Sequence, residues 1–299
     1  MDLNTDNLNR LRVGYNGAYK RGLGAATAMS GRLVTRVPAT VMEQDYGWMN
    51  KLPRVREWIG GRVVQNLSAS DYKIKERPWE LTIGVNRDHI ETDNLGIYSV
   101  AFEQMGESTG SFSEELVWET LMSGFSTNCY DGQYFFDTDH PVLDKDGVTM
   151  LSVANTDGGA GAPWFLMDVS RVLKPVVLQV RRDFGDIVAR DKVTDDNVFD
   201  FNEFRYGVDA RLNTGFGLWQ MCWGSKQDLN TDTYNLARSS LLGMTGDHGR
   251  KLGIKPQLLV CGSSNDKKAR ALLNSDRKAN GATNEDQGTA ELMVVPWLP

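Results

Sequence analysis

The clearest pattern of hydrophobic and polar positions runs from residue 72 to residue 85. Every second residue is apolar over two short stretches, and these apolar residues are Tyr72, Ile74, Trp79, Leu81, Ile83 and Val85. Alternation with a period of two predicts half-buried β-strands, here on either side of a turn at Glu76-Arg77-Pro78. A ribbon of two strands is only marginally stable in water, so its apolar face has to pack on the rest of the chain or on another copy of it.

A helical pattern follows this ribbon. Apolar residues recur at helical spacing in two groups, which are Ile97, Val100, Ala101 and Met105, and then Phe112, Leu116, Leu121 and Phe125. The run Ser111-Phe112-Ser113-Glu114 fits a capping box, which marks a helix start. Gly106 and Gly110 each cost about 1 kcal/mol in a helix interior. We therefore expect a single long helix to be weakened or kinked between the two groups.

The first 45 residues are polar and have only weak periodicity. Five glycines interrupt any helix there, and they are Gly14, Gly17, Gly22, Gly24 and Gly31. This pattern favours an arm that takes its shape from a partner, with at most some helix around Ala25–Met29. Further along, the glycine-rich stretch between Ser152 and Pro163 predicts a mobile loop.

The second half of the chain mixes strands and helices without a regular repeat. Strands are predicted at 176–180, at 206–212 with a turn at 213–215 into the apolar run 216–223, at 258–261 and at 292–297. Helices are predicted at 233–244 and 266–274, followed by a polar loop over 274–289. Elements mixed in this way predict an α+β fold rather than a regular βαβ fold.

Composition and charge narrow the class of protein. The chain is 40% hydrophobic and 24% charged, as globular proteins are, and its 39 acidic against 33 basic residues give a net charge of −6. A protein that mainly grips nucleic acid would carry a basic surplus. No apolar run approaches the roughly 20 residues of a membrane span, and the polar, acidic start is not a secretory signal. Three distant cysteines suit a reducing cytoplasm.

Candidate catalytic chemistry is sparse. Two carboxylates and an imidazole, those of Asp137, Asp139 and His140, could hold a divalent metal, but Asp, Thr and Pro after Tyr134-Phe135-Phe136 also build a turn, and we favour the turn. Cys129 is interpreted as a buried structural thiol rather than a nucleophile served by His140. The chain contains no HExxH, CxxC, P-loop lysine or GxSxG motif. The residues therefore predict neither an enzyme nor a bound cofactor.

Several separated runs together resemble the major head subunit family of Mu-like phages and prophages. These runs are Leu52–Gly60, Trp79–Ile83, Asp93–Tyr98, Cys129–Pro141, Tyr206–Arg211 and Gly217–Gln220, and they occur in nearly the family's order across residues 46–299. The run from Tyr130 to Pro141 is the most specific. The resemblance implies the tailed-phage (HK97-like) major capsid fold, in which an arm and a long hairpin, the E-loop, reach across neighbouring subunits.

The resemblance also implies how the chain is divided. It places an N-terminal arm at 1–45, the E-loop region at 46–95, and the spine helix and peripheral domain at 96–164. Residues 165–287 are then mainly the axial domain, and residues 288–299 supply a closing strand of the peripheral domain.

The implied function is a structural one. The protein is expected to self-assemble into pentamers and hexamers of an icosahedral phage head around double-stranded DNA, which a net acidic subunit contacts only non-specifically. Assembly with scaffold, maturation protease and portal proteins is expected in the bacterial host cytoplasm, without a membrane, and the product is the virion capsid. The alternatives are an encapsulin-like compartment shell or a metal-dependent hydrolase built on the Asp137–His140 site.

Five residues are the predicted contacts between subunits. They are Arg54, Arg56, Trp58, Trp79 and Glu80, with the charged residues as ion pairs and the tryptophans as anchors. The opposing interpretation is that both tryptophans belong to the core of a single subunit.

Overall fold

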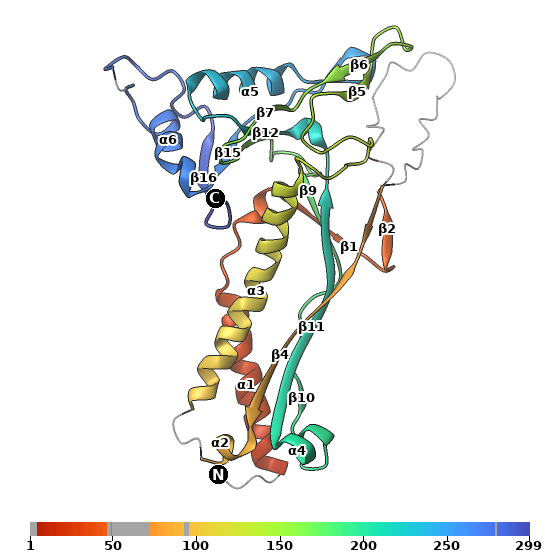
Figure 1. Cartoon of the computed structure of the whole chain (residues 1–299), viewed down its shortest axis with the longest axis vertical. Helices are drawn as coiled ribbons and strands as arrows, with labels where there is room; N and C mark the ends of the chain where they lie inside the picture. Colours follow the sequence, from red (N-terminus) through yellow and green to blue (C-terminus); the bar gives the residue numbers. More distant parts are fainter. Residues whose placement is uncertain (1–4, 47–48, 50–71, 93–95, 279) are drawn as a thin grey trace.

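The computed structural model describes residues 5–46, 49, 72–92, 96–278 and 280–299. The chain forms a long stalk with a broader unit at one end (Figure 1). The N-terminal end of the described chain lies at the far tip of the stalk, and the C-terminus lies near the junction of the two parts. The architecture mixes helices and sheets, as the order of predicted elements indicated.

The stalk combines one sheet with two long helices. Its strands are β1 (Val34–Pro38), β9 (Val176–Arg182), β11 (Glu203–Phe216) and β10 (Val188–Arg190) in spatial order, with β4 (Arg77–Asn86) also paired to β11. Beside the sheet lie α1 (Thr5–Ala25) and α3 (Ile97–Ser123), and α2 (Arg87–Thr92) and α4 (Asp196–Phe201) close the tip (Figure 1). Alternate residues of β4 and β11 face this helical layer, which explains their period of two.

The broader unit holds the second sheet. Its strands run in the order β16 (Glu291–Val294), β15 (Leu258–Cys261), β8 (Trp164–Met167), β12 (Cys222–Lys226) and β7 (Thr156–Gly159). Every residue of β8 and β15 is buried, because α5 (Thr231–Gly243), α6 (Ser263–Leu273) and the segments around them cover the sheet. Continuous apolar runs such as 258–261 are typical of central strands of this kind.

Short elements connect and decorate the two parts. They are η1 (Ser30–Arg32), the paired strands β2 (Glu43–Asp45) and β3 (Lys73–Lys75), the hairpin of β5 (His140–Leu143) and β6 (Met150–Val153), η3 (Trp219–Met221), and β13 (Thr245–Gly246), η4 (Asp247–Gly249) and β14 (Arg250–Lys251). The β5–β6 hairpin projects from the broader unit (Figure 1).

The predicted arm is largely a regular helix, which corrects the prediction that its glycines prevent one. Gly22 lies where α1 crosses α3, and a Cβ atom there would come within 1.8 Å of the Glu103 carbonyl oxygen. A Cβ on Gly106 would lie 2.0 Å from the Tyr19 carbonyl oxygen. These glycines therefore allow two helices to approach closely, and α3 runs unbroken through Gly106 and Gly110.

Three local predictions also fail. The proposed capping box at Ser111 lies in the middle of α3, the loop predicted after Ser152 contains strand β7, and the turn predicted at 213–215 is part of β11. In the last case, pairing with β9 at Asn213–Phe216 keeps the chain extended through turn-forming residues. The other predicted strands and helices of the second half occur within a few residues of their expected bounds.

The two sheets group the chain differently from the predicted boundaries. Strands β9 and β11, within 165–287, pair with β1 and β4 in the stalk, whereas β7 and β8, within 96–164, belong to the broader unit. Strand β16, in the 288–299 segment, pairs with β15 in that same unit. The chain thus passes repeatedly between the two parts.

Candidate functional site

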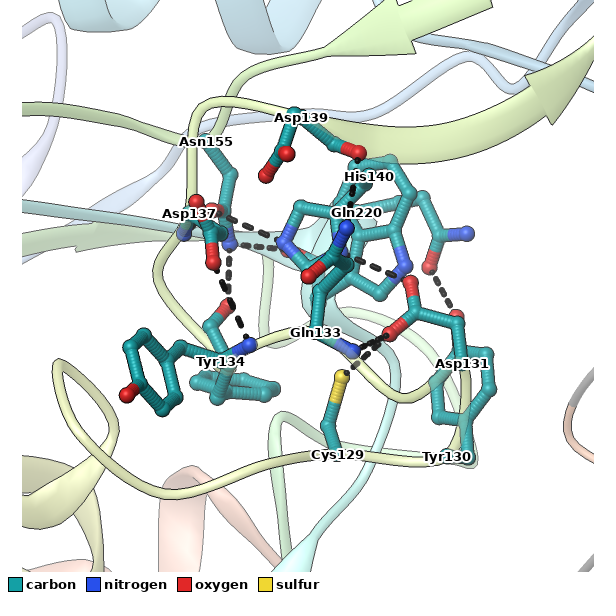
Figure 2. A network of polar contacts seen from close by, with 12 residues as sticks. Cys129, Tyr130, Asp131, Gln133, Tyr134, Asp137, Asp139, His140, Asn155 and Gln220 are labelled. Carbon is teal, nitrogen blue, oxygen red and sulfur yellow. Dashed lines mark hydrogen bonds and ion pairs between the residues drawn. The ribbon is translucent and has the colours of Figure 1, made fainter. Parts of the chain in front are cut away.

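The polar cluster that the sequence singled out lies where α3 ends and the β5–β6 hairpin begins. After Gly124 the chain forms a tight loop, in which the amide of Cys129 donates to the carbonyl of Gln133 and Gly132 takes a positive φ of 91°. Only a residue without a Cβ adopts that conformation easily. The loop places Cys129 and Asp131 beside His140, the first residue of β5 (Figure 2).

His140 is completely buried, and its ring contacts two acceptors. Its Nδ1 lies 2.7 Å from Asp131 Oδ2, and its Nε2 lies 3.2 Å from Asn155 Oδ1. The ring stacks on Trp219 of η3, with centroids 3.9 Å apart and an interplanar angle of 7°. Three segments that are distant in sequence therefore meet at one imidazole.

Asn155 joins the cluster to the surrounding backbone. Its Nδ2 donates to the carbonyls of Phe135 at 2.8 Å, Cys222 at 3.2 Å and Trp219 at 3.3 Å. Its Oδ1 accepts from the amide of Asp137 at 2.9 Å. A completely buried amide with all of these partners rigidifies the segments that it links.

The predicted metal ligands do not converge. Asp137 and Asp139 are not buried, and the Asp137 carboxylate accepts from the amides of Thr138 at 2.7 Å and Tyr134 at 3.3 Å. A hydrogen bond between Asp139 and Asp137 raises the pKa of Asp139, so these two carboxylates face each other. The His140 ring instead contacts Asp131, which the sequence reasoning did not select, although Asp131 lies inside the family-like run.

Cys129, Asp131 and His140 form the one trio of possible metal ligands among the described residues, with ligand atoms within 4.8 Å of one another. Their spacing fits protons rather than a metal. Nδ1 and Oδ2 are 2.7 Å apart, whereas two ligands about 2.0–2.1 Å from a tetrahedral zinc lie roughly 3.3 Å apart. The trio is therefore a hydrogen-bonded structural cluster.

Cys129 is placed as a structural thiol. Its Sγ donates to Asp131 Oδ1 at 3.1 Å, and the residue is buried. Burial, together with the nearby Asp131 charge, raises the pKa of the Cys129 thiol far above its ordinary range. A nucleophilic cysteine needs the opposite shift, because the thiolate is the reactive form.

The predicted subunit contacts fall into two groups. Arg54, Arg56 and Trp58 lie outside the described residues. Trp79 is half-buried in β4, where its ring packs edge-on against Phe112 of α3 with centroids 4.7 Å apart and its Nε1 donates to the Leu212 carbonyl at 3.0 Å. The neighbouring Glu80 is exposed and accepts a hydrogen bond from the Thr82 hydroxyl at 2.7 Å.

Exposed apolar side chains at the tip of the stalk were missed by the sequence reasoning. Phe199 and Phe201 of α4 are 85% and 66% exposed, and Val188 of β10 is 68% exposed. Clusters of exposed large apolar residues are typical of surfaces that another molecule covers. The only sequence signal was the pair of phenylalanines in a short run of acidic residues, which does not separate a surface from a core.

Among the described residues, no helix is long and apolar enough to span a membrane. Residues 8–298 match the family described as Mu-like prophage major head subunit gpT. The chain is 38% identical over 288 residues to the major capsid protein of Escherichia phage Mu, with 94% of each chain covered. It is 36% identical over 287 residues to the Mu-like prophage FluMu major head subunit of Haemophilus influenzae, covering 94% of this chain and 93% of that one.

Solved structures give the same relationship. A chain in the procapsid of bacteriophage JBD30 aligns with a TM-score of 0.86 at 36% identity, covering 99% of this chain and 100% of that chain. A chain in the JBD30 capsid aligns with a TM-score of 0.77 at 27% identity, covering 92% of both.

Proposed function

The chain belongs to the Mu-like prophage major head subunit family, and from this premise we propose that copies of it assemble into the pentamers and hexamers of an icosahedral phage head around double-stranded DNA. The match of residues 8–298 to a family of structural head proteins carries the proposal. The alternatives of an encapsulin-like compartment and a metal-dependent hydrolase have no comparable support, and Asp137, Asp139 and His140 do not form one site.

The shape and surface of the subunit support assembly. Its long stalk places the exposed Phe199, Phe201 and Val188 far from the broader unit (Figure 1). A stable protein interface buries roughly 1,200–2,000 Å², and several such contacts per subunit close a durable shell even when each is weak. The tip of the stalk is one surface that neighbours cover in this proposal.

The domain assignment follows the two sheets rather than the earlier boundaries. The stalk is assigned to the peripheral domain and the broader unit to the axial domain. Residues 1–45 remain the N-terminal arm, and the E-loop reaches a neighbour from within the 46–95 region. Arg54, Arg56, Trp58, Trp79 and Glu80 remain candidates for its contacts, with Glu80 the best placed of the described pair because its carboxylate is exposed.

The remaining partners follow from head assembly as a process. A scaffold, a maturation protease and a portal protein are proposed to act with the subunit in the bacterial host cytoplasm. Packaged DNA contacts it only non-specifically, since a chain of net charge −6 offers no general attraction for phosphate.

Negative-stain electron microscopy with size-exclusion chromatography tests the proposal on the full chain. Closed shells, tubes or rings of five and six subunits are expected. If the protein alone stays monomeric or dimeric, coexpression with the neighbouring scaffold gene decides: a subunit that still forms no particles contradicts the proposal.

Paired variants test the two described contact candidates. Glu80→Lys should leave a folded subunit and abolish shells, with Glu80→Gln intermediate, because only the reversal makes a formerly attractive contact repulsive. Trp79→Ala is expected to fold but not assemble, and Trp79→Phe separates ring packing from the Leu212 hydrogen bond. Normal shells remove a residue from the contact list, whereas an unfolded Trp79→Ala chain assigns Trp79 to the core.

A further inference from the structure

The hydrogen bonds of Asn155 determine what the His140 ring must do. Asn155 Oδ1 accepts from the Asp137 amide, while its Nδ2 donates to three carbonyl groups. Exchanging the two amide atoms would set donor against donor and oxygen against oxygen. The oxygen is therefore the atom that faces His140 Nε2, and Nε2 must carry a hydrogen.

The other ring nitrogen also faces acceptors. Asp131 Oδ2 lies 2.7 Å from Nδ1, and Asp131 Oδ1 accepts from the Gln133 amide at 3.1 Å and the Cys129 thiol at 3.1 Å. A neutral imidazole has only one N–H, which Nε2 already uses. One further proton must therefore lie between Nδ1 and Oδ2, either on the ring or on the carboxyl group.

Three observations place that proton on the ring. The Asp131 carboxylate receives two other hydrogen bonds, which favour its ionised form. Burial raises the pKa of Asp131, but hydrogen bonds and charge from His140, with those from Cys129 and Gln133, outweigh burial and lower it. The Trp219 face, 3.9 Å from the imidazole, attracts a cationic ring.

The contact also spans a complete structural unit. Asp131 lies before β5, His140 is its first residue, and Asn155 follows β6, so these three side chains join both ends of the β5–β6 hairpin (Figure 2). The hairpin exposes Val148, Met150 and Leu151 by 83%, 58% and 42%. Their position relative to the second sheet depends on how firmly the base of the hairpin is closed.

We propose that His140 is held as an imidazolium whose charge closes the base of the β5–β6 hairpin, and that loss of the ring proton at alkaline pH opens it. Without that proton, a nitrogen lone pair faces a carboxylate oxygen at hydrogen-bond distance, and the contact becomes repulsive. This inference goes beyond the proposed assembly function, because it concerns the single subunit and holds whether or not shells form.

The described ionisable groups facing the ring from the surrounding elements are acids, a thiol and a phenol. They are Asp131, Cys129 and Tyr130 in the loop, Asp137 and Asp139 before β5, and Asp247 of η4, which accepts from the Leu143 amide. From η3, Trp219 and Gln220 bring no charge. The ring is thus the cation of this group.

The chain offers a direct test because it contains only three histidines, His89, His140 and His248. In the double variant His89→Gln/His248→Gln, ¹⁵N-histidine labelling reports on His140 alone. Both ring nitrogens should be protonated at pH 7 by NMR of the full-length protein. A neutral ring protonated only at Nε2, or a metal found bound by elemental analysis, overturns the proposal.

Hydrogen exchange of residues 141–153 tests the mechanical part. At the pH where NMR detects loss of the ring proton, exchange of these amides, corrected for base catalysis and compared with α5, should rise about tenfold or more, as expected when a hydrogen bond to a charged group is lost. Unchanged exchange contradicts the hairpin device even if the ring is an imidazolium.

Asp131→Asn is the matched variant. An asparagine at this position donates to a neutral Nδ1 and still accepts from Cys129 and Gln133, so it keeps the geometry without the charges. We expect a folded protein whose hairpin exchange no longer steps with pH. A step of the same size in this variant assigns the pH response to another group and overturns the proposal.

Discussion

Single buried residues hold the tip of the stalk together. Asp191 is completely buried, and its carboxylate accepts hydrogen bonds from the Arg12 guanidinium and, at 3.2 Å, from the Tyr206 hydroxyl. The Asp191 hydrogen bond and charge raise the pKa of Arg12 despite its partial burial. Arg12 belongs to α1 and Asp191 follows β10, so this pair fastens the N-terminal helix to the sheet.

Arg12→Ala should lower the free energy of unfolding by about 3 kcal/mol, because it leaves a buried carboxylate without its cation. Urea denaturation of the unassembled subunit measures this loss. Arg21→Ala is the control on the same helix, since its pair with Glu103 is exposed on both sides and is worth less than about 1 kcal/mol. Equal losses in the two variants contradict the importance assigned to Asp191.

Between elements, the close crossing of α1 and α3 is the main device of the stalk. Ala18 and Tyr19 of α1 have no exposed surface, and the Tyr19 hydroxyl lies 3.1 Å from the Thr109 hydroxyl of α3. Glycine at positions 22 and 106 brings the helix backbones into contact. The helix propensity lost at each glycine is offset by this packing.

Gly106→Ala should destabilise the subunit and detach α1, because the added methyl group would overlap the Tyr19 carbonyl. Gly14→Ala provides the opposite expectation: nothing lies within 4 Å of that position, so the substitution should stabilise α1 by up to about 1 kcal/mol. Thermal unfolding and limited proteolysis of α1 distinguish the two. A neutral Gly106→Ala result would contradict the close-packing interpretation.

For the whole molecule, burial and exposure separate folding from assembly. The cores of the stalk and of the broader unit are closed within one chain, as Phe204 and Phe165 illustrate with no exposed surface. Large aromatic residues on α4 remain uncovered. The subunit therefore folds on its own core and keeps separate apolar contacts for its neighbours.

Phe199→Asp should accordingly leave stability within about 0.5 kcal/mol of the parent, as exposed positions usually do, yet reduce the yield of shells strongly. Circular dichroism measures the first effect, and sedimentation with electron microscopy measures the second. Asp200→Asn on the same helix is the control for a general effect of surface charge. Normal particle yield from Phe199→Asp would remove the stalk tip from the assembly surface.

Much of the local structure could be predicted because it follows from neighbouring residues. The apolar run 258–261 and the helix after it were placed correctly, as was the alternation of β4. Predictions failed where a distant partner decides the outcome. Gly22 looks like a helix breaker until Glu103 is opposite it, and residues 213–215 look like a turn until β9 pairs with them.

The sequence by itself determined the α+β class, the family and the absence of any motif for catalysis, because periodicity and motif order are properties of the chain as written. Only the tertiary structure decided that His140 pairs with Asp131 rather than with Asp137 and Asp139, that Arg12 reaches Asp191, and that Phe199 is exposed. Each of these depends on which segments fold against one another. Spacing along the chain does not encode those distances, whereas burial, hydrogen-bond partners and charge state all depend on them.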